Sequence, residues 1–409
     1  MKSRWIQAAA LLALAPAAAL AFETVDSLPF PSDGRFPAWP ADPERPWTIF
    51  AYGGAMYDSN PLRIPLGIPL EEESDTIARL GVGGRSLTRI VGRQRLLLEG
   101  FGEYRDYADF NELDHAAYGV RADWLWEIGN QTDGIVGYRR SKRLVDLGEF
   151  RSLQRTMVTE ESAIVDGGYR FSPDWRIFAG LEHERTKRDF DEIEWLNATS
   201  LTGSLTYRTP LANEIGGLVR VTRGEARVAD EVSLIDDYDE IEVAATVSYT
   251  LGAQLRLGAR LGHTERNYEA LPIRDFDGPT YRASVDWLPT TKLVFTLEGF
   301  RRPQSVADVT ATHVVRQGAS FGVRWAPTFK LVFTMRFINE EREYAGDLGA
   351  LALGIQREDT LRTWRFGAGW ELQRHLQLGL GFDYGERTSN LPSANYDYDQ
   401  VMLNARWTF

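Results

Sequence analysis

The chain has 409 residues, a formal net charge of −12 and no cysteine. A disulfide framework and a thiolate metal site are therefore excluded. Basic residues do not gather into runs with interleaved aromatic residues, which argues against nucleic-acid binding.

The first segment, residues 1–21, has the order of a secretory signal peptide. Lys2 and Arg4 form a positive start, a short apolar stretch follows, and residues 19–21 (Ala-Leu-Ala) form a small-x-small cleavage site. The apolar stretch is too short for a transmembrane helix. We expect cleavage after Ala21 and export of the mature chain across the inner membrane.

The next segment, residues 22–46, is rich in proline and shows no hydrophobic period. Proline fixes φ and lacks a backbone N–H, so neither helix nor sheet is expected here. We interpret this segment as an extended periplasmic arm, with a plug-like role as the alternative.

From residue 47 to residue 409 the chain becomes a series of segments in which apolar and polar residues alternate. In the clearest segment Ile241, Val243 and Ala245 alternate with Glu240 and Glu242. This period of two places the two sets on opposite faces of a strand. The predicted strands are 47–57, 75–86, 92–107, 113–126, 132–145, 155–171, 175–190, 193–207, 213–228, 236–251, 254–269, 275–288, 291–302, 312–326, 329–344, 357–372, 375–388 and 395–409.

The connections between these segments alternate in length. Short turns are predicted at 172–174, 252–253, 289–290 and 327–328. Longer loops are predicted at 58–74, 146–154, 229–235, 303–311 and 345–356. Short periplasmic turns, long extracellular loops and an even strand number are typical of outer-membrane barrels. The sequence therefore predicts an all-β, antiparallel up-and-down transmembrane barrel of about 18 strands over residues 47–409, in the outer membrane of a Gram-negative-type bacterium.

Aromatic residues divide between the two ends of the predicted strands. Tryptophans lie near the short turns or the C-terminus: Trp175, Trp287, Trp325, Trp370 and Trp407. Tyrosines lie at the opposite ends: Tyr104, Tyr107, Tyr268, Tyr344 and Tyr384. We expect these two sets to form the aromatic belts at the two membrane interfaces.

The last strand ends in an unbroken apolar face. Its residues are Val401, Leu403, Ala405, Trp407 and Phe409. A terminal aromatic residue on such a strand resembles the signal by which the outer-membrane barrel assembly machinery recognises its clients, so this machinery is an expected partner.

The polar face of a barrel this wide is expected to line an aqueous channel. Charged residues at membrane depth are tolerated where they meet water and opposite charges. The candidate pore-lining residues are Arg93, Arg95, Glu99, Arg121, Asp123, Arg170, Arg220, Arg256, Arg260, Arg282, Asp286, Arg324, Arg365 and Arg406. Rings of such charges can tune which solutes pass. The alternative is that each charge only solvates and braces the wall.

Motifs of hydrolytic enzymes are absent from the sequence. The five histidines are scattered over separate segments, and neither His-Glu-x-x-His nor Gly-x-Ser-x-Gly occurs. We therefore expect neither an enzyme nor a cofactor or metal ion. The acidic loop segments 71–73, 236–237 and 239–240 are interpreted as solvated, with Ca²⁺ that bridges lipopolysaccharide phosphates as the alternative.

Several short segments carry a family resemblance. They are 74–77 (Ser-Asp-Thr-Ile), 93–95 (Arg-Gln-Arg), 274–278 (Arg-Asp-Phe-Asp-Gly), 357–361 (Arg-Glu-Asp-Thr-Leu), 386–390 (Glu-Arg-Thr-Ser-Asn) and 396–399 (Tyr-Asp-Tyr-Asp). In their order and spacing the chain resembles the EpsL-type outer-membrane proteins of exopolysaccharide operons, grouped as putative β-barrel porin 2. The resemblance implies a role in carrying a secreted polysaccharide through the outer membrane.

The function expected from the resemblance is a passive aqueous pore for exopolysaccharide export, with the polysaccharide and a periplasmic export protein as partners. Two alternatives stay open: a general or solute-specific diffusion porin for uptake, and a non-conducting surface barrel whose loops bind partners. Lipopolysaccharide or another outer-membrane lipid is expected around the barrel in each case.

Overall fold

The computed structural model describes residues 47–65, 74–148, 155–189, 194–227, 235–269, 272–305, 313–345 and 356–409. The predicted signal peptide, the predicted arm and the acidic segment 71–73 lie outside the described residues. Among the described residues, no helix is long and apolar enough to cross a membrane.

Strands dominate the described chain. They are β1 (Trp47–Asp58), β2 (Asp75–Arg89), β3 (Arg95–Tyr107), β4 (His115–Ile128), β5 (Thr132–Leu144), β6 (Met157–Arg170), β7 (Trp175–Arg188), β8 (Glu194–Arg208), β9 (Glu214–Arg227), β10 (Ile235–Leu251), β11 (Leu255–Tyr268), β12 (Phe276–Thr290), β13 (Leu293–Ser305), β14 (His313–Trp325), β15 (Leu331–Ala345), β16 (Arg357–Gln373), β17 (Leu376–Ser389) and β18 (Tyr396–Thr408). Each coincides with a predicted strand to within three residues.

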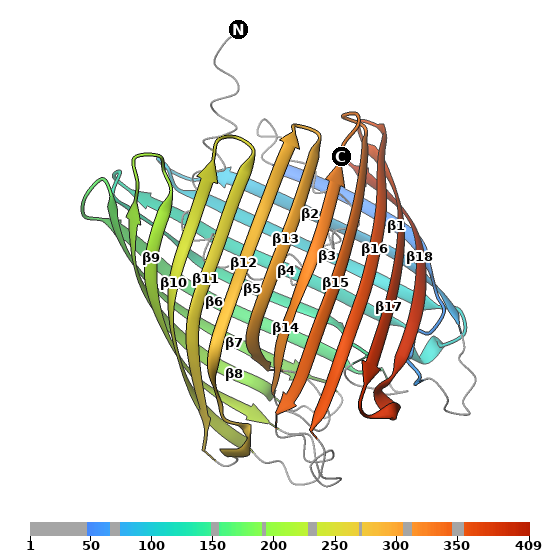
Figure 1. Ribbon diagram of the computed structural model, residues 1–409. Coiled ribbons are helices and arrows are strands. Elements are labelled where there is room, and N and C mark those ends of the chain that lie inside the picture. The colour runs from blue at the N-terminus through green and yellow to red at the C-terminus, as the bar shows by residue number, and fades with distance from the viewer. Residues whose placement is uncertain are drawn as a thin grey trace.

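The strands form one closed antiparallel sheet (Figure 1). Each strand pairs with its neighbours in the sequence, and β1 pairs with both β2 and β18, which closes the ring. Closure leaves no strand edge with unpaired N–H and C=O groups. The predicted up-and-down barrel of 18 strands is confirmed.

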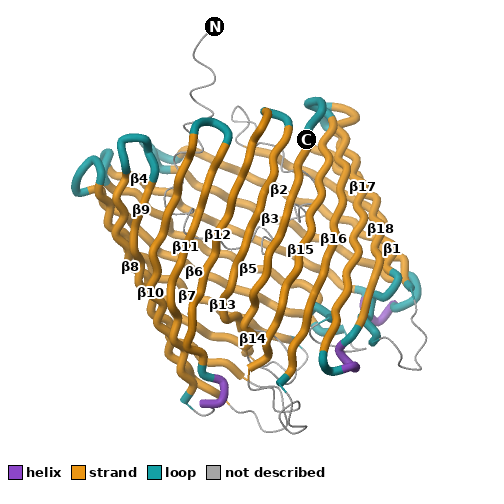
Figure 2. The backbone as a smooth tube through the Cα atoms, viewed as in Figure 1, coloured by secondary structure: helices purple, strands orange, loops and turns teal. Residues whose placement is uncertain are grey.

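The connections alternate in length around the barrel. The end that carries the start of β1 and the end of β18 has short turns, such as 129–131, 252–254 and 291–292. Gly129 and Gly252 have positive φ in two of these turns, a conformation that glycine adopts without strain. The opposite, long-loop end carries three short 3-10 helices, η2 (Asn111–Leu113), η3 (Pro272–Arg274) and η4 (Pro392–Ala394), at the lower side of Figure 2.

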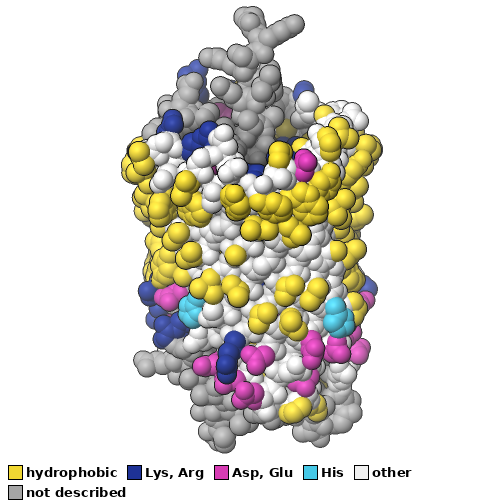
Figure 3. Space-filling model, turned by 90° about the vertical axis from the view of Figure 1, so that its left-hand side faces the viewer, with side chains coloured by type: hydrophobic (Ala, Val, Ile, Leu, Met, Phe, Trp, Pro, Cys, Tyr) yellow, Lys and Arg dark blue, Asp and Glu magenta, His cyan; other side chains and the backbone are white. Residues whose placement is uncertain are grey.

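Large apolar side chains lie on the outside of the barrel, not in a dry interior. Leu80 is 71% exposed, Leu201 is 57% exposed and Leu403 is 61% exposed. Figure 3 shows hydrophobic side chains around the outer surface, most densely toward the short-turn end. An outer face of this kind needs lipid around it, because water would leave the apolar area unburied.

The predicted aromatic belt at the short-turn end is confirmed. Its five tryptophans are between 39% and 49% exposed and lie on the outer face. Some of them pack against aromatic residues of the next strand, as Trp287 does with Phe295 at a centroid distance of 5.2 Å.

The predicted belt at the long-loop end is partly wrong. Tyr107, Tyr268 and Tyr344 are 5%, 4% and 1% exposed and lie on the inner face. Tyr104 and Tyr384 lie on the outer face. Nearness to a strand end fixes the level of a residue along the barrel, whereas its odd or even place in the strand fixes the face.

Candidate functional site

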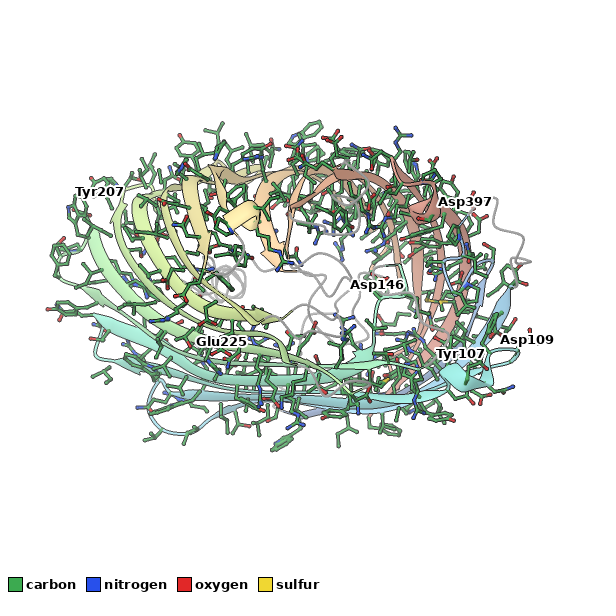
Figure 4. The ribbon with its side chains drawn as sticks, turned by 90° about the horizontal axis from the view of Figure 1, so that it is seen from below. Tyr107, Asp109, Asp146, Tyr207, Glu225 and Asp397 are labelled. Carbon is green, nitrogen blue, oxygen red and sulfur yellow. The ribbon has the colours of Figure 1, made fainter. Side chains whose placement is uncertain are left out.

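The candidate site is the inner face of the barrel, where the polar residues of all strands meet. In the end-on view of Figure 4 the strands form a ring, with Tyr207 on its outside and Asp146 on its inside. Residues directly opposite each other on neighbouring strands share a face. Arg260, for example, lies opposite Thr246 of β10 and Arg282 of β12.

The register places most of the predicted pore-lining residues on this inner face. They are Arg95, Glu99, Arg121, Asp123, Arg170, Arg220, Arg256, Arg260, Arg282, Asp286, Arg324, Arg365 and Arg406. The structure thus brings them into one surface, and their role in conduction stays a prediction.

Arg93 is the exception, because it does not lie on a strand. The turn between β2 and β3 occupies residues 90–94, with Gly92 at positive φ. Arg93 extends from this turn to the next one, where its guanidinium donates a hydrogen bond of 3.1 Å to the carbonyl of Gly129. Its guanidinium also lies 3.7 Å from the carboxylate of Glu127, an inner-face residue opposite Asp133, so its place at the short-turn mouth of the channel stays a prediction.

Single acidic residues on the inner face are shared by two arginines. Glu298 accepts from Arg282 at 3.3 Å and from Arg336 at 3.1 Å. The same arrangement recurs for Glu99 with Arg85 and Arg121, Asp133 with Arg170 and Arg176, Glu340 with Arg316 and Arg342, and Asp359 with Arg357 and Arg387. In each of these groups two guanidinium groups contact one carboxylate, and in the Glu99 group Arg121 also binds Asp123.

The basic residues of the inner face are all arginines in the described strands. Of the chain's lysines, Lys142 and Lys187 lie on the outer face, and Lys292 and Lys330 lie in short turns. Arginine stays charged at any physiological pH and presents a planar fork that matches a carboxylate or phosphate. The sharing of acids follows from register, so it could not be seen in the sequence order.

Three long-loop segments fold toward the inner face and pack together. Leu62, Phe110, Leu113 and Leu147 form a buried cluster with Ile77 and other residues of the wall. Leu113 is completely buried. The barrel is therefore lined by ordered loop residues on the side of β1 to β6, which narrows this end.

One of these segments is anchored to a distant part of the wall. Arg387 of β17 donates a hydrogen bond of 2.5 Å to the carbonyl of Gly148, which follows β5. Five strands, β18 and β1 to β4, separate β17 from β5 along the ring. Arg387 also binds the carboxylate of Asp359, and both side chains are fully buried. Its guanidinium also donates to the hydroxyl of Tyr344 at 2.5 Å.

A second anchor joins the β1–β2 loop to β18. Arg63 forms an ion pair of 3.0 Å with Asp58 and lies 3.8 Å from the ring centroid of Tyr398. Burial lowers the pKa of the Arg63 guanidinium, but the carboxylate of Asp58 outweighs it and the pKa is raised overall. The guanidinium therefore remains charged.

Replacement of Arg387 by glutamine is expected to release the segment at residue 148 and to destabilise the barrel. The substitution removes one of the two arginines that compensate the buried Asp359, and loss of one partner of a buried pair costs up to about 3–5 kcal/mol. Faster amide hydrogen exchange over residues 145–148 and a lower unfolding midpoint are the expected results. Arg365→Gln is the control, because it also removes an arginine from a buried acid, Asp383 at 3.6 Å, but lies away from residue 148 in the chain. Equal exchange in both variants would contradict the anchor.

The segments that carried the family resemblance hold loops and turns in place. The carboxylate of Asp75 accepts hydrogen bonds from the backbone N–H groups of residues 108, 109 and 110. Asp275 accepts one from the N–H of Tyr268 at 2.8 Å, and Asn395 accepts one from the N–H of Ser389 at 2.6 Å. These residues fix the loops at the long-loop end rather than a binding site.

Comparisons with known proteins agree with this geometry. The sequence model of the family described as putative β-barrel porin 2 matches residues 213–409. The structure of OccK2 (OpdF) from Pseudomonas aeruginosa is similar, with a TM-score of 0.52, 11% identity, and coverage of 89% of this chain and 98% of that chain. No curated protein matches the chain in sequence.

The protein is an outer-membrane β-barrel. A BenF-like porin from Pseudomonas fluorescens Pf-5 has the same architecture, with a TM-score of 0.51, 9% identity, and coverage of 88% of this chain and 98% of that chain. A second structure of OccK2, in complex with glucuronate, has a TM-score of 0.50 at 11% identity, and 89% of this chain and 98% of that chain are covered.

The orientation of the barrel in the outer membrane follows from its ends. The short turns lie on the periplasmic side and the long loops on the extracellular side, as is usual for outer-membrane barrels. The resemblance to β-barrel porin 2 is supported over residues 213–409. These comparisons do not support the finer resemblance to EpsL-type proteins of exopolysaccharide operons.

Proposed function

We propose that the protein is a passive diffusion channel of the outer membrane that prefers small hydrophilic anions, with carboxylates as the best-matched class. The observation that carries this proposal is the sharing of single inner-face acids by two arginines, as in Arg282–Glu298–Arg336. An arginine fork on the channel wall can bind a solute carboxylate weakly, in water, and pass it on.

The similar structures support the uptake alternative better than export. One of them is described as a porin, and another was solved with glucuronate, a sugar acid. Polysaccharide export, which the family resemblance implied, has no comparable support. The ordered loop segments inside the extracellular end also favour a channel for small solutes over a wide path for a polymer.

Reversal potentials of the purified protein in planar bilayers under a KCl gradient test the proposal. We expect anion selectivity, because the inner face has more arginines than acids. The double variant Arg282→Gln/Arg336→Gln leaves Glu298 without its two ion pairs, so the ratio of chloride to potassium permeability should fall at least about twofold. Lys292→Gln, in a periplasmic turn, removes a basic residue away from the wall and should leave the ratio unchanged.

The alternatives give different results. Cation selectivity of the unmodified barrel would contradict the proposal, and a trace that stays closed under all conditions would favour the non-conducting surface barrel. Faster entry of glucuronate than of glucose into protein-containing liposomes is expected for the proposed channel. Loss of secreted polysaccharide on gene deletion, with unchanged small-solute permeability, would instead favour export.

A further inference from the structure

A groove with a volume of about 300 Å³ lies over the strands β1 to β5, which are neighbours in the sheet (Figure 1). Its small lining residues include Gly84, Gly100 and Ala122. Its large lining residues include Trp47, Leu98 and Tyr138. We call this hollow, as defined by these residues, the β1–β5 groove.

The register places the groove on the outer, lipid-facing side of the wall. Gly100 lies opposite both Gly84 and Val120, and Val120 is 43% exposed. Ala122 lies opposite Tyr138, which is 42% exposed. Residues directly opposite each other share a face. The groove is therefore continuous with the apolar surface around which acyl chains lie, and the channel is on the other side of the wall.

The two glycines of the groove are not required by the backbone. Neither Gly84 nor Gly100 has positive φ. A Cβ atom on Gly100 would lie 3.6 Å from its nearest neighbour, the carbonyl oxygen of Gly119, and one on Gly84 would lie 3.4 Å from the carbonyl oxygen of Thr48. Larger residues would therefore fit and would fill the groove. Glycine inside a strand costs stability and often marks a place where a ligand approaches the backbone closely.

Two tryptophans set the depth of the groove in the membrane. Trp47 begins β1 at the periplasmic end and is 61% exposed. Trp124 lies on β4 two residues from Ala122 toward the periplasmic turn, and its indole N–H donates a hydrogen bond of 3.1 Å to the side chain of Gln94. Exposed tryptophans of this kind lie at headgroup level. Tyr138 lies midway along β5, so the groove runs from the periplasmic headgroups to the middle of the membrane.

The chemistry of the groove suits an apolar, elongated occupant. Its large side chains are hydrophobic or aromatic, and the hydroxyl of Ser86, which also lines it, already shares a hydrogen bond of 2.8 Å with the hydroxyl of Thr88. A volume of about 300 Å³ is within the range of pockets that hold small molecules. The surrounding bilayer supplies acyl chains at this position.

We propose that the β1–β5 groove binds one acyl chain of a phospholipid from the periplasmic leaflet. The glycerol end of the chain lies beside Trp47 and the methyl end lies at Tyr138. Bulk lipid tails are as apolar as the wall, so the chain is retained by close packing against the groove and not by a hydrophobic driving force.

Photo-cross-linking of the purified barrel in phosphatidylethanolamine vesicles tests the proposal. One probe is phosphatidylethanolamine with a diazirine at the methyl end of an acyl chain, and the other carries the diazirine next to the glycerol. Labelled residues are located by mass spectrometry. The methyl-end probe should label Tyr138 at least about fivefold more than the glycerol-end probe does, and the reverse should hold at Trp47, because packing fixes the direction of the chain.

Variants that fill the groove should remove this labelling. Gly100→Phe places a ring where the chain would lie, so labelling of Tyr138 by the methyl-end probe should fall at least about fivefold. Gly102→Phe is the matched control, because it adds the same ring on the same face of β3 outside the groove, where a Cβ atom would meet nothing within 4 Å. Its labelling should equal that of the unmodified barrel. If Gly100→Phe does not fold, Ala122→Leu fills the groove from β4 and should give the same loss.

Three results would overturn the proposal. They are unchanged labelling of Tyr138 in the filled variants, equal labelling of Tyr138 by the two probes, and the opposite direction of the chain, which would assign the groove to a lipid of the extracellular leaflet. Disulfide formation between two copies of Gly100→Cys, in a chain that has no other cysteine, would assign the groove to contact between barrels and would also overturn it. None of these outcomes bears on anion selectivity, which concerns the inner face.

Discussion

Deletion of residues 396–409 is expected to abolish assembly of the barrel completely. β18 pairs with β17 on one side and with β1 on the other, so its removal leaves two open edges. Within the bilayer no water is available for the N–H and C=O groups of an open edge, and each unsatisfied group costs several kcal/mol. The expected readout is loss of the heat-modifiable, folded band from the outer-membrane fraction.

Point variants separate closure of the sheet from recognition of the C-terminal strand. Trp407→Ala/Phe409→Ala keeps the backbone pairing but removes two residues of the apolar face, which are 43% and 64% exposed. If this face is an assembly signal, as we infer, the variant should assemble slowly in cells and refold normally in detergent. Arg406→Gln, on the inner face of the same strand, is the control. A folded barrel from the truncated chain would contradict the closure argument.

Arginine at position 201 is expected to destabilise the barrel strongly, whereas arginine at position 202 is not. Leu201 lies on the outer face near the middle of β8 and is 57% exposed to lipid. Thr202, its neighbour, lies on the inner face beside Arg220. A basic residue on the lipid face near the midplane costs about 2–4 kcal/mol, while the inner face meets water.

Reversible unfolding in urea with lipid vesicles measures the difference in the free energy of unfolding. Leu201→Ala controls for loss of the leucine side chain without the added charge. Equal destabilisation by Leu201→Arg and Thr202→Arg would mean that the two faces do not differ in environment, and the membrane orientation of the strands would then be wrong.

Prediction from sequence was accurate where one local pattern decides the outcome. The alternation around Ile241 and Val243 fixes a strand, and its parity fixes the lipid-facing side. The short turn at 252–254 followed from turn-forming residues between alternating segments, whereas the turn predicted at 289–290 lies at 291–292 because β12 continues to Thr290. Both signals act over a few neighbouring residues, so they can be recognised in the amino-acid sequence alone.

Prediction failed where the place of a residue along its strand was used without its parity, or where a strand began later than predicted. Tyr268 lies at the right level along its strand for an interfacial belt, but its even position in the alternation places its side chain on the inner face. There its ring packs against Tyr238, with 5.4 Å between the ring centroids. Arg93 was placed on the predicted strand 92–107, but it lies with Gly92 in the turn at 90–94 that precedes β3. For Tyr268, one residue along the strand decides which face of the barrel the side chain lies on.

The sequence by itself determined the strands, their number, the two faces and the end at which the long connections lie. It could do so because water, lipid and turn geometry act on each segment independently. Only the tertiary structure decided that single acids are shared between arginines of separate strands. The same holds for Arg387, which reaches the carbonyl of Gly148 across the inside, and for Arg140 and Arg185, which flank Glu161 on the outside. These contacts join residues far apart in the chain, and closure of the ring sets which of them meet.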